Sequence, residues 1–253
     1  MKLIINKIPN IGKIKSQYLR DGFVVVKNLI SVQDIDLIKV DLQKLIEENL
    51  NKNDKRQINK IDGNIINSLH DLKNWHWIKK IQNNFILRNL ITKLLDEKIE
   101  NFGAELFAKP SKSGLAVPPH QDNYYWCLNS HNALTVWIAI DKSTNENGGI
   151  YYYSKSHELG LLEHLPSFVP GSSQKIKYIK PMSMFKKITP KLNAGDCLIH
   201  NCAIVHGSNV NMSNNPRRGL TVRYRAKSAK IDNFLKKRYE NDLSIQIKKR
   251  SKK

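Results

Sequence analysis

A histidine and an aspartate separated by one residue are the side chains in this chain best suited to chemistry. His120 and Asp122 follow two prolines, which favour extended backbone, and residues two apart on a strand point to the same face. His206 lies far downstream at the end of an apolar run. Two imidazoles and one carboxylate form the ligand set with which non-haem Fe(II) oxygenases hold iron while leaving coordination positions open. The sequence therefore predicts an iron centre formed by His120, Asp122 and His206.

Other histidines compete for the third ligand position. An apolar strand leads into His206, and a glycine and a serine follow it, which favours this residue. His200 lies six residues earlier in a similar apolar setting and stays open as the alternative. His131, His157 and His164 stand in turn-rich or polar segments and are weaker candidates.

Arginines downstream of the distal histidine could bind a cosubstrate. Arg217 follows that histidine by eleven residues and precedes a strand-like run. An arginine there can bind a carboxylate in bidentate fashion. This suits the C5 carboxylate of 2-oxoglutarate, a molecule whose C1 carboxylate and C2 carbonyl can chelate iron. Arg218 and Arg223 are the alternatives.

The first 100 residues are expected to be mainly helical after one short strand. Residues 22–28 are β-branched and aromatic, which predicts that strand. Ser31 is a predicted N-cap, and the apolar residues after it have helical spacing, so a helix should run to about Asn49. A second helical region is predicted over 75–95, and the polar stretch 50–65 is expected to be a loop.

From residue 101 the sequence is typical of a β-protein. Strand-like runs separated by turns rich in Gly and Asn occur at 105–109, 134–140, 149–153, 175–179, 196–199 and 220–224. Many short strands with such punctuation favour a sandwich or barrel. We therefore expect a fold that is mainly β with flanking helices.

One domain is expected over residues 1–253. It would comprise a mainly helical part up to about residue 100, a β core over about 101–226, and a basic C-terminal segment over 227–253. The last residues, 247–253, are expected to be a solvated, frayed end.

Composition narrows the class of protein. A chain of 253 residues and 29.2 kDa can form one large domain or two small ones. No apolar run reaches about 18 residues, so no membrane-spanning helix is predicted, and the apolar part of the N-terminus is too short for a signal peptide. The cysteines, Cys127, Cys197 and Cys202, are odd in number and lack Cys-x-x-Cys spacing. This argues against a disulfide framework and a structural zinc site, and the cytoplasm is the expected compartment.

The chain is strongly basic. Its 42 Lys and Arg side chains against 22 Asp and Glu give a net charge of +20. The excess is mostly lysine, is dispersed, and accompanies many Asn and Ile residues, which is typical of compositional bias. A nucleic-acid partner is therefore disfavoured, and an anionic small substrate is compatible with the charge. An oxygenase acting on nucleic acid or another polyanion stays open as an alternative that requires a basic stripe beside the iron.

Several ordered motifs make the chain resemble the phytanoyl-CoA dioxygenase family of Fe(II)/2-oxoglutarate-dependent oxygenases, which includes ectoine hydroxylase. The resemblance runs from Gly22 to about Tyr224. Its motifs lie at residues 22–26, 119–126, 134–141, 146–149, 154–157, 194–196 and 206–211, with Arg217 closing the set. Ser154 and Lys155 replace the usual Pro-Gly before Ser-His, which concerns a local turn rather than the chemistry.

The resemblance implies a double-stranded β-helix, the jelly-roll of cupin-like proteins, with helices on one face. It implies that the three predicted ligands hold iron and that Arg217 pairs with the C5 carboxylate of 2-oxoglutarate. Thr135 and Ser208 stand where the family places hydroxyl contacts to this cosubstrate. Tyr124 and Trp126, which follow the ligand pair, are candidates for lining the substrate mouth.

The resemblance also implies an activity. Fe(II), 2-oxoglutarate and O₂ would be used to hydroxylate a C–H bond of a small-molecule substrate, with release of succinate and CO₂. Halogenating relatives lack the carboxylate ligand, so Asp122 favours hydroxylation. A cupin-like metal protein without oxygenase activity is the remaining alternative. Neither the substrate nor the oligomeric state follows from the sequence.

Overall fold

The computed structural model describes residues 3–52, 54, 57–61 and 65–250. Its helices are α1 (Ile11–Asp21), α2 (Val32–Leu50), α3 (His76–Gln82), α4 (Phe85–Leu95), α5 (Asp122–Trp126) and α6 (Asn233–Arg250), with 3₁₀ turns η1 (Leu72–Asn74), η2 (Ser156–Leu159) and η3 (Lys180–Met184). Its strands are β1 (Phe23–Val26), β2 (Ile58–Ile61), β3 (Ile65–Leu69), β4 (Ile99–Lys109), β5 (Val117–His120), β6 (Ala133–Ala139), β7 (Ile150–Tyr153), β8 (His164–Val169), β9 (Ser172–Ile176), β10 (Lys187–Ile188), β11 (Cys197–Asn201), β12 (His206–Ser208) and β13 (Arg217–Ala226).

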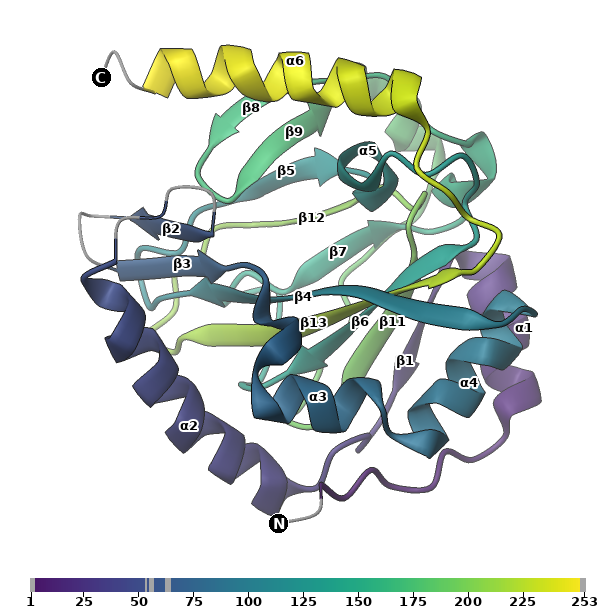
Figure 1. Cartoon of the computed structure of the whole chain (residues 1–253), viewed down its shortest axis with the longest axis vertical. Helices are drawn as coiled ribbons and strands as arrows, with labels where there is room; N and C mark the ends of the chain where they lie inside the picture. The colour runs from purple at the N-terminus through teal and green to yellow at the C-terminus, as the bar shows by residue number, and fades with distance from the viewer. Residues whose placement is uncertain (1–2, 53, 55–56, 62–64, 251–253) are drawn as a thin grey trace.

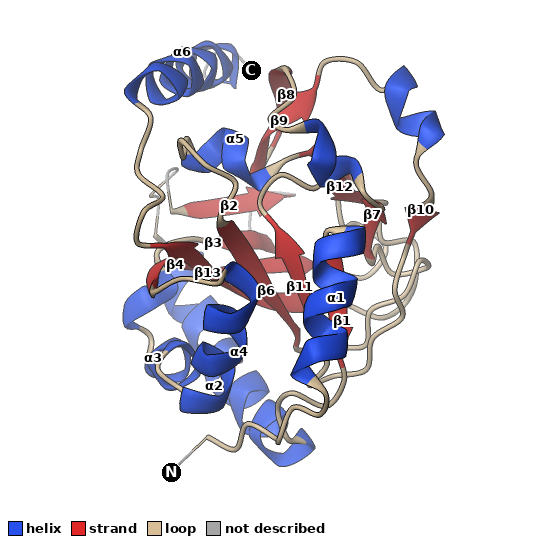
Figure 2. Cartoon of the chain, turned by 90° about the vertical axis from the view of Figure 1, so that its right-hand side faces the viewer, coloured by secondary structure: helices blue, strands red, loops and turns tan. Residues whose placement is uncertain are grey.

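Two antiparallel sheets form the body of the protein. The larger has the order β1-β11-β6-β13-β4-β3-β2, the smaller has the order β10-β7-β12-β5, and β8 and β9 form a separate hairpin. Helices α2, α3 and α4 cover one face of the larger sheet (Figures 1 and 2). This arrangement is the predicted jelly-roll with helices on one face. No helix in the described part of the chain is long and apolar enough to cross a membrane.

Because side chains alternate along the central strands, one face of the larger sheet contributes to the main apolar core and the other faces the smaller sheet. On β6, Leu134 and Val136 belong to the main apolar core, which also contains the buried faces of the helices. Thr135 and Trp137 therefore point to the opposite face, toward the smaller sheet. Strand β13 follows the same alternation, with Leu220 in the apolar core. The inner face of the larger sheet is thus the place for polar side chains from β6 and β13.

The N-terminal part confirms the expected strand and first helix. Ser31 accepts a hydrogen bond from the Asp34 N–H at 3.1 Å and begins α2. The second helical region is divided into α3 and α4, because Asn84 accepts hydrogen bonds from the N–H groups of Ile86 and Leu87 and starts a new helix. The helix α1 had not been predicted.

Two expectations about local structure are wrong, and a third is confirmed only in part. The predicted loop 50–65 contains β2, although residues 53, 55–56 and 62–64 of it lie outside the described residues. The predicted strand 175–179 is confirmed in part, because β9 covers residues 175 and 176 but begins at Ser172 and ends at Ile176. The C-terminal end is helical to Arg250, since α6 packs against α5 and β8. The final three residues lie outside the described part.

Candidate active site

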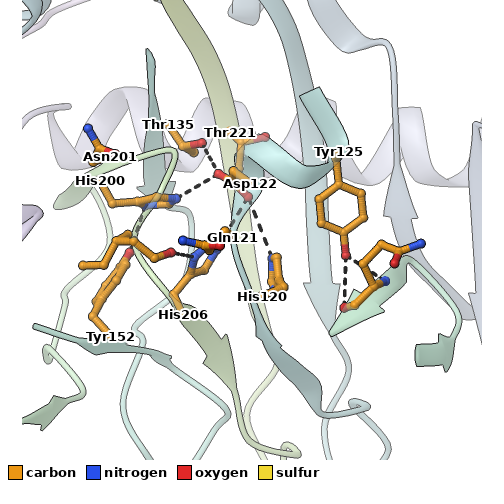
Figure 3. Close-up of polar contacts among 12 residues, drawn as sticks. His120, Gln121, Asp122, Tyr125, Thr135, Tyr152, His200, Asn201, His206 and Thr221 are labelled. Carbon is orange, nitrogen blue, oxygen red and sulfur yellow. Dashed lines mark hydrogen bonds and ion pairs between the residues drawn. The ribbon is translucent and has the colours of Figure 1, made fainter. Parts of the chain in front are cut away.

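Two histidines and one aspartate meet between the two sheets. His120 ends β5, His206 begins β12, and the two are directly paired residues of these antiparallel strands. Asp122 Oδ1 lies 3.8 Å from His120 Nε2 and 3.6 Å from His206 Nε2 (Figure 3). One ligand atom from each side chain lies within 4.8 Å of the others. This grouping can hold one metal ion, and it contains the three side chains that the sequence analysis selects.

Asp122 reaches this group from a helix rather than from a strand. Strand β5 ends at His120, and Gln121 is the N-cap of α5, so Asp122 is the first residue of that helix. The expectation that both ligands share one strand is therefore wrong. The fully buried Gln121 amide donates to the carbonyls of Gly160 at 2.7 Å and Ala203 at 2.5 Å. This anchored turn directs Asp122 toward the histidines.

Both histidines present the same nitrogen to the metal position. His120 Nδ1 lies 2.9 Å from the Pro118 carbonyl, and His206 Nδ1 lies 3.1 Å from the Ile204 carbonyl. Because a carbonyl only accepts, each Nδ1 carries the proton and each Nε2 keeps its lone pair for a metal. Burial, followed by the nearby His120, lowers the pKa of His206 to about 3, and burial also lowers the pKa of His120. Both are thus neutral, as metal binding requires.

The second carboxylate oxygen of Asp122 is held by two neighbours. Oδ2 accepts a hydrogen bond from Thr135 Oγ1 at 2.6 Å and lies 3.1 Å from His200 Nε2 (Figure 3). His200 Nδ1 in turn lies 3.0 Å from the Tyr152 hydroxyl. His200 is therefore not grouped with the ligands but contacts the oxygen on the other side of Asp122. Oδ1 is the oxygen that faces the two ligand histidines.

The environment keeps Asp122 ionised. Burial alone would raise its pKa, but His206, His200 and His120 together lower the pKa well below the usual range of a carboxyl group. An ionised carboxylate and two neutral imidazoles are the protonation states in which these groups bind a divalent metal.

Two buried basic side chains lie where the start of β13 pairs with the end of β4. Arg217 and Lys109, which are paired residues of β13 and β4, are each 3% exposed. Arg217 donates to the Gly148 carbonyl at 3.0 Å and its guanidinium lies over the Trp137 ring, but its Nε has no hydrogen-bond partner in the described part of the chain. The Lys109 ammonium contacts the Leu115 carbonyl. Among the described residues, no carboxylate pairs with either cation. The pair is therefore suited to a buried anion.

The pKa values of Lys109 and Arg217 support an anion-binding site between these two side chains. Burial, together with the charge of Arg217, lowers the pKa of Lys109 to about 6. Burial likewise lowers the pKa of Arg217 to about 10. Gly148 makes room for the lysine, because a Cβ at this position would lie 2.6 Å from Lys109 Cδ. Sequence analysis missed Lys109, since a lysine at the end of a strand gives no signal that it faces inward.

The alternative arginines have acidic partners. Arg218 forms a two-pronged contact with Asp141, at 2.8 and 2.9 Å. Arg223 Nη2 lies 2.5 Å from Glu105 Oε1. Of the three candidates, Arg217 is the one that has no acidic partner among the described residues.

The predicted hydroxyl contacts occupy different places. Thr135 is engaged by Asp122, as described above. Ser208 is 3% exposed and lies two residues after His206 on β12, so both point to the same side of the strand. Their contact with a cosubstrate stays a prediction.

The aromatic residues of α5 have distinct neighbours. The Tyr124 hydroxyl donates to Asp242 of α6 at 2.7 Å, so this residue attaches α6 to the body. Trp126 packs edge-on against the Phe102 ring, with centroids 5.0 Å apart. Tyr125 lies between them in sequence and contacts the His120 ring edge-on at 5.6 Å. Tyr125 is thus the aromatic residue of α5 that reaches an iron-ligand candidate.

The weaker histidine candidates lie outside the ligand group. His164 Nε2 accepts a hydrogen bond from the Gln121 N–H at 3.1 Å. His164 therefore supports the turn before Asp122. His157 Nε2 lies 3.1 Å from the Leu19 carbonyl, which is a structural contact with α1.

Comparisons with known proteins agree with this geometry. The family model of phytanoyl-CoA dioxygenase matches residues 18–219. A phytanoyl-CoA dioxygenase domain-containing protein 1 homolog of Dictyostelium discoideum is 24% identical over 92% of this chain and 95% of its own length. Phytanoyl-CoA dioxygenase domain-containing protein 1 of Bos taurus is 31% identical over 46% of this chain and 41% of its own.

Solved structures share the fold. EctD from S. alaskensis, solved with 2-oxoglutarate and 5-hydroxyectoine, has a TM-score of 0.76 at 17% identity, covering 91% of this chain and 81% of its own. The α-ketoglutarate-dependent epimerase SnoN has a TM-score of 0.67 at 19% identity, covering 87% of this chain and 84% of its own. The family match spans most of the chain and includes the His120, Asp122 and His206 group. The chain therefore belongs to the phytanoyl-CoA dioxygenase family of iron- and 2-oxoglutarate-dependent oxygenases.

Proposed function

We propose that this protein hydroxylates a C–H bond of a small-molecule substrate, using Fe(II), 2-oxoglutarate and O₂ and releasing succinate and CO₂. The observation that carries the proposal is the combination of the three-ligand group with the buried cations Lys109 and Arg217 on the same inner face. Trp137 and Tyr152 connect the two sites: the first lies under Arg217, and the ring of the second stacks near that of His206.

The protein's contribution is to bind, orient and shield the reactants. When bound, the iron supplies the redox chemistry that couples decarboxylation of 2-oxoglutarate to substrate hydroxylation. His120, Asp122 and His206 would hold the metal with three protein ligands, a set typical of iron centres that react with a cosubstrate and O₂. Lys109 and Arg217 would bind the distal carboxylate of 2-oxoglutarate, which fixes its orientation. Tyr125, packed against His120, would help to hold this ligand ring in place.

Asp122 supports hydroxylation as the outcome. A carboxylate held on one oxygen by Thr135 and His200 directs its other oxygen to the metal position. A halogenating enzyme needs that coordination position for a halide.

Proteins of similar fold include an epimerase and a carbocyclase, so the products of turnover, analysed by mass spectrometry, identify the reaction type.

The alternatives have less support. An oxygenase acting on polyanions needs a continuous stripe of basic side chains beside the site, yet Arg218, Arg223 and Arg225 of β13 each lie next to an acid, which reduces the positive charge there. A cupin-like metal protein without a cosubstrate gives no role to the unpaired Arg217. The three cysteines are free and buried, which fits the reducing cytoplasm as the proposed compartment.

Turnover of 2-oxoglutarate tests the proposal directly. Purified protein with Fe(II), 2-oxoglutarate and ascorbate should release succinate slowly even without substrate. The variant His120→Ala should lose this activity, because one iron ligand is missing, while His131→Ala, outside the ligand group, should keep it. Full succinate release by the His120 variant would refute the iron assignment.

A further inference from the structure

Arg223 is a charged residue on the inner face of the larger sheet, close to an iron-ligand candidate. It is the Cα partner of Thr135 across β13 and β6, and the Thr135 hydroxyl bonds Asp122. Its neighbour Val222 lies in the apolar core on the helical side. Alternation along the strand therefore directs Arg223 toward the inner face, and directly paired side chains have Cβ atoms about 5 Å apart.

The guanidinium of Arg223 is held in one position. It lies over the rings of Phe102 at 5.2 Å and Trp126 at 5.7 Å, and Nη2 contacts Glu105 Oε1 at 2.5 Å. Gly103 leaves space for it, because a Cβ at that position would lie 2.0 Å from Arg223 Nη2. The surrounding residues thus fix the cation before any ligand arrives.

In this cluster the guanidinium of Arg223 still has N–H donors to offer, whereas the carboxylate oxygens of Glu105 are already engaged. A guanidinium has five N–H donors, and Glu105 is the one partner that the described structure gives to the Arg223 side chain. About a quarter of that side chain stays exposed, whereas the Glu105 side chain is 6% exposed. The second oxygen of Glu105 already accepts from Thr221 at 2.7 Å. An incoming group therefore meets donors, which favours an anion over a cation.

A chain of aromatic side chains connects the surroundings of Arg223 with the iron-ligand candidates. Tyr239 of α6 lies within electrostatic range of Arg223 and packs edge-on against Tyr125 at 5.7 Å. Tyr125 contacts the His120 ring. Figure 1 shows α6 passing over α5 and the β8–β9 hairpin at this end of the molecule. A molecule bound at Arg223 would thus lie beneath α6 and beside the ligand group.

We propose that Arg223 binds a carboxylate of the substrate, so that the substrate class is a compact organic acid whose reacting carbon lies a few bonds from that carboxylate. This inference rests on the proposed function. A planar carboxylate matches the fork of a guanidinium. The short path from Arg223 past Thr135 to Asp122 favours a compact molecule over a long chain.

A matched panel of compounds tests the substrate class. Small carboxylic acids would be compared with the primary amides, amines and phosphate monoesters of the same carbon skeletons, added to the protein with Fe(II) and 2-oxoglutarate. In the wild type, carboxylates should raise succinate release above the rate without added compound. In Arg223→Gln, the concentration needed for that increase should rise about tenfold to a hundredfold, as expected for loss of a charged hydrogen bond.

Two further variants make the result specific. Arg225→Gln, two residues along β13 and paired with Glu100, is the control and should respond like the wild type. Gly103→Ala keeps the charge but displaces the guanidinium, so it should weaken the response as Arg223→Gln does, and thermal unfolding checks that each variant is folded.

The possible results distinguish a failure of the Arg223 inference from a failure of the proposed function. Stimulation by amides, amines or phosphate esters rather than carboxylates, stimulation by no carboxylate, or an unaltered response of Arg223→Gln would overturn the inference. Absence of any succinate release from the wild type would instead contradict the proposed function itself.

Discussion

Individual residues divide the inner face into a metal position and an anion position. Asp122 joins the metal position to its support, because Oδ1 faces His120 and His206 while Oδ2 contacts Thr135 and His200. Contacts of this outer kind orient metal ligands and tune their affinity. The anion position differs in that Arg217 and Lys109 have no acidic partner among the described residues, which favours the binding of an anion.

Proton uptake should accompany the binding of 2-oxoglutarate. The pKa of Lys109 is lowered to about 6 in the structure, so this lysine is mostly neutral at pH 8. A bound carboxylate favours its charged form, and the affinity for 2-oxoglutarate should therefore decrease as the pH rises above 6. Calorimetry at pH 8 in buffers of different ionisation enthalpy should show uptake of up to about one proton per site.

The variant Lys109→Met is the control for that experiment. It should bind 2-oxoglutarate more weakly near pH 6, with the added proton uptake removed. Equal proton uptake by the variant and the wild type would assign the effect to another group.

At the scale of secondary-structure elements, the turn from β5 to α5 determines whether Asp122 lies beside His120 and His206. Strand β5 pairs with β12, which brings His120 opposite His206. The chain then leaves the strand at Gln121, whose side chain is fully buried and contacts three backbone groups from other segments. This one side chain ties the turn to the segments before β8 and before β12.

Replacement of Gln121 by alanine should affect both stability and metal binding. The change leaves the carbonyls of Gly160 and Ala203 and the N–H of Leu162 without their partner. We expect a loss of about 3 kcal/mol in the free energy of unfolding, measured with urea on metal-free protein. The affinity for Fe(II) should also decrease, because Asp122 is less well placed.

Gln43→Ala provides the comparison. This residue lies on the exposed side of α2, where its amide contacts Glu47, and its replacement should change the free energy of unfolding by less than about 0.5 kcal/mol. Similar losses in both variants would show that the Gln121 contacts do not stabilise the turn.

At the scale of the whole molecule, the fold buries several histidines in a strongly basic protein. The two sheets enclose the ligand group, and His164 supports it from the neighbouring hairpin. Burial is the first cause that lowers the pKa of His164 and His206 to about 3. The folded state therefore favours neutral imidazoles, and this preference makes the free energy of unfolding depend on pH.

Metal-free protein should lose stability in mild acid. His164 and His206 have folded pKa values of about 3 against about 6.5 in the unfolded chain, so the unfolded state binds more protons below pH 6.5. Between pH 7.5 and 5 the free energy of unfolding should fall by about 2 kcal/mol for each of them. Urea unfolding across this range measures the effect.

The variant His164→Gln separates the two contributions. It should be less stable than the wild type at pH 7.5 but show a shallower decrease toward pH 5. A free energy of unfolding that stays constant over this range would contradict the burial of neutral histidines.

Sequence analysis succeeded where local chemistry determines structure. The cap at Ser31 and the helical spacing after it predicted α2, and runs of β-branched residues predicted β1 and β6. It placed two short strands with the wrong bounds: the strand expected to hold both His120 and Asp122 is β5, which ends at His120, and the strand expected to lead into His206 is β12, which begins there. Such short segments have little intrinsic preference, and their pairing with other strands stabilises them.

The sequence by itself determined the residue types of the metal group, its candidate members and the family motifs around them. The tertiary structure decided which histidine joins His120, which arginine has no acidic partner among the residues that the structure describes, and that Lys109 lies beside Arg217. The physical reason is that these relations depend on strand register between distant segments. Strand register is set by burial on one face of each strand. A local sequence pattern indicates that a segment tends to form a strand, but it does not identify the strand with which that segment pairs.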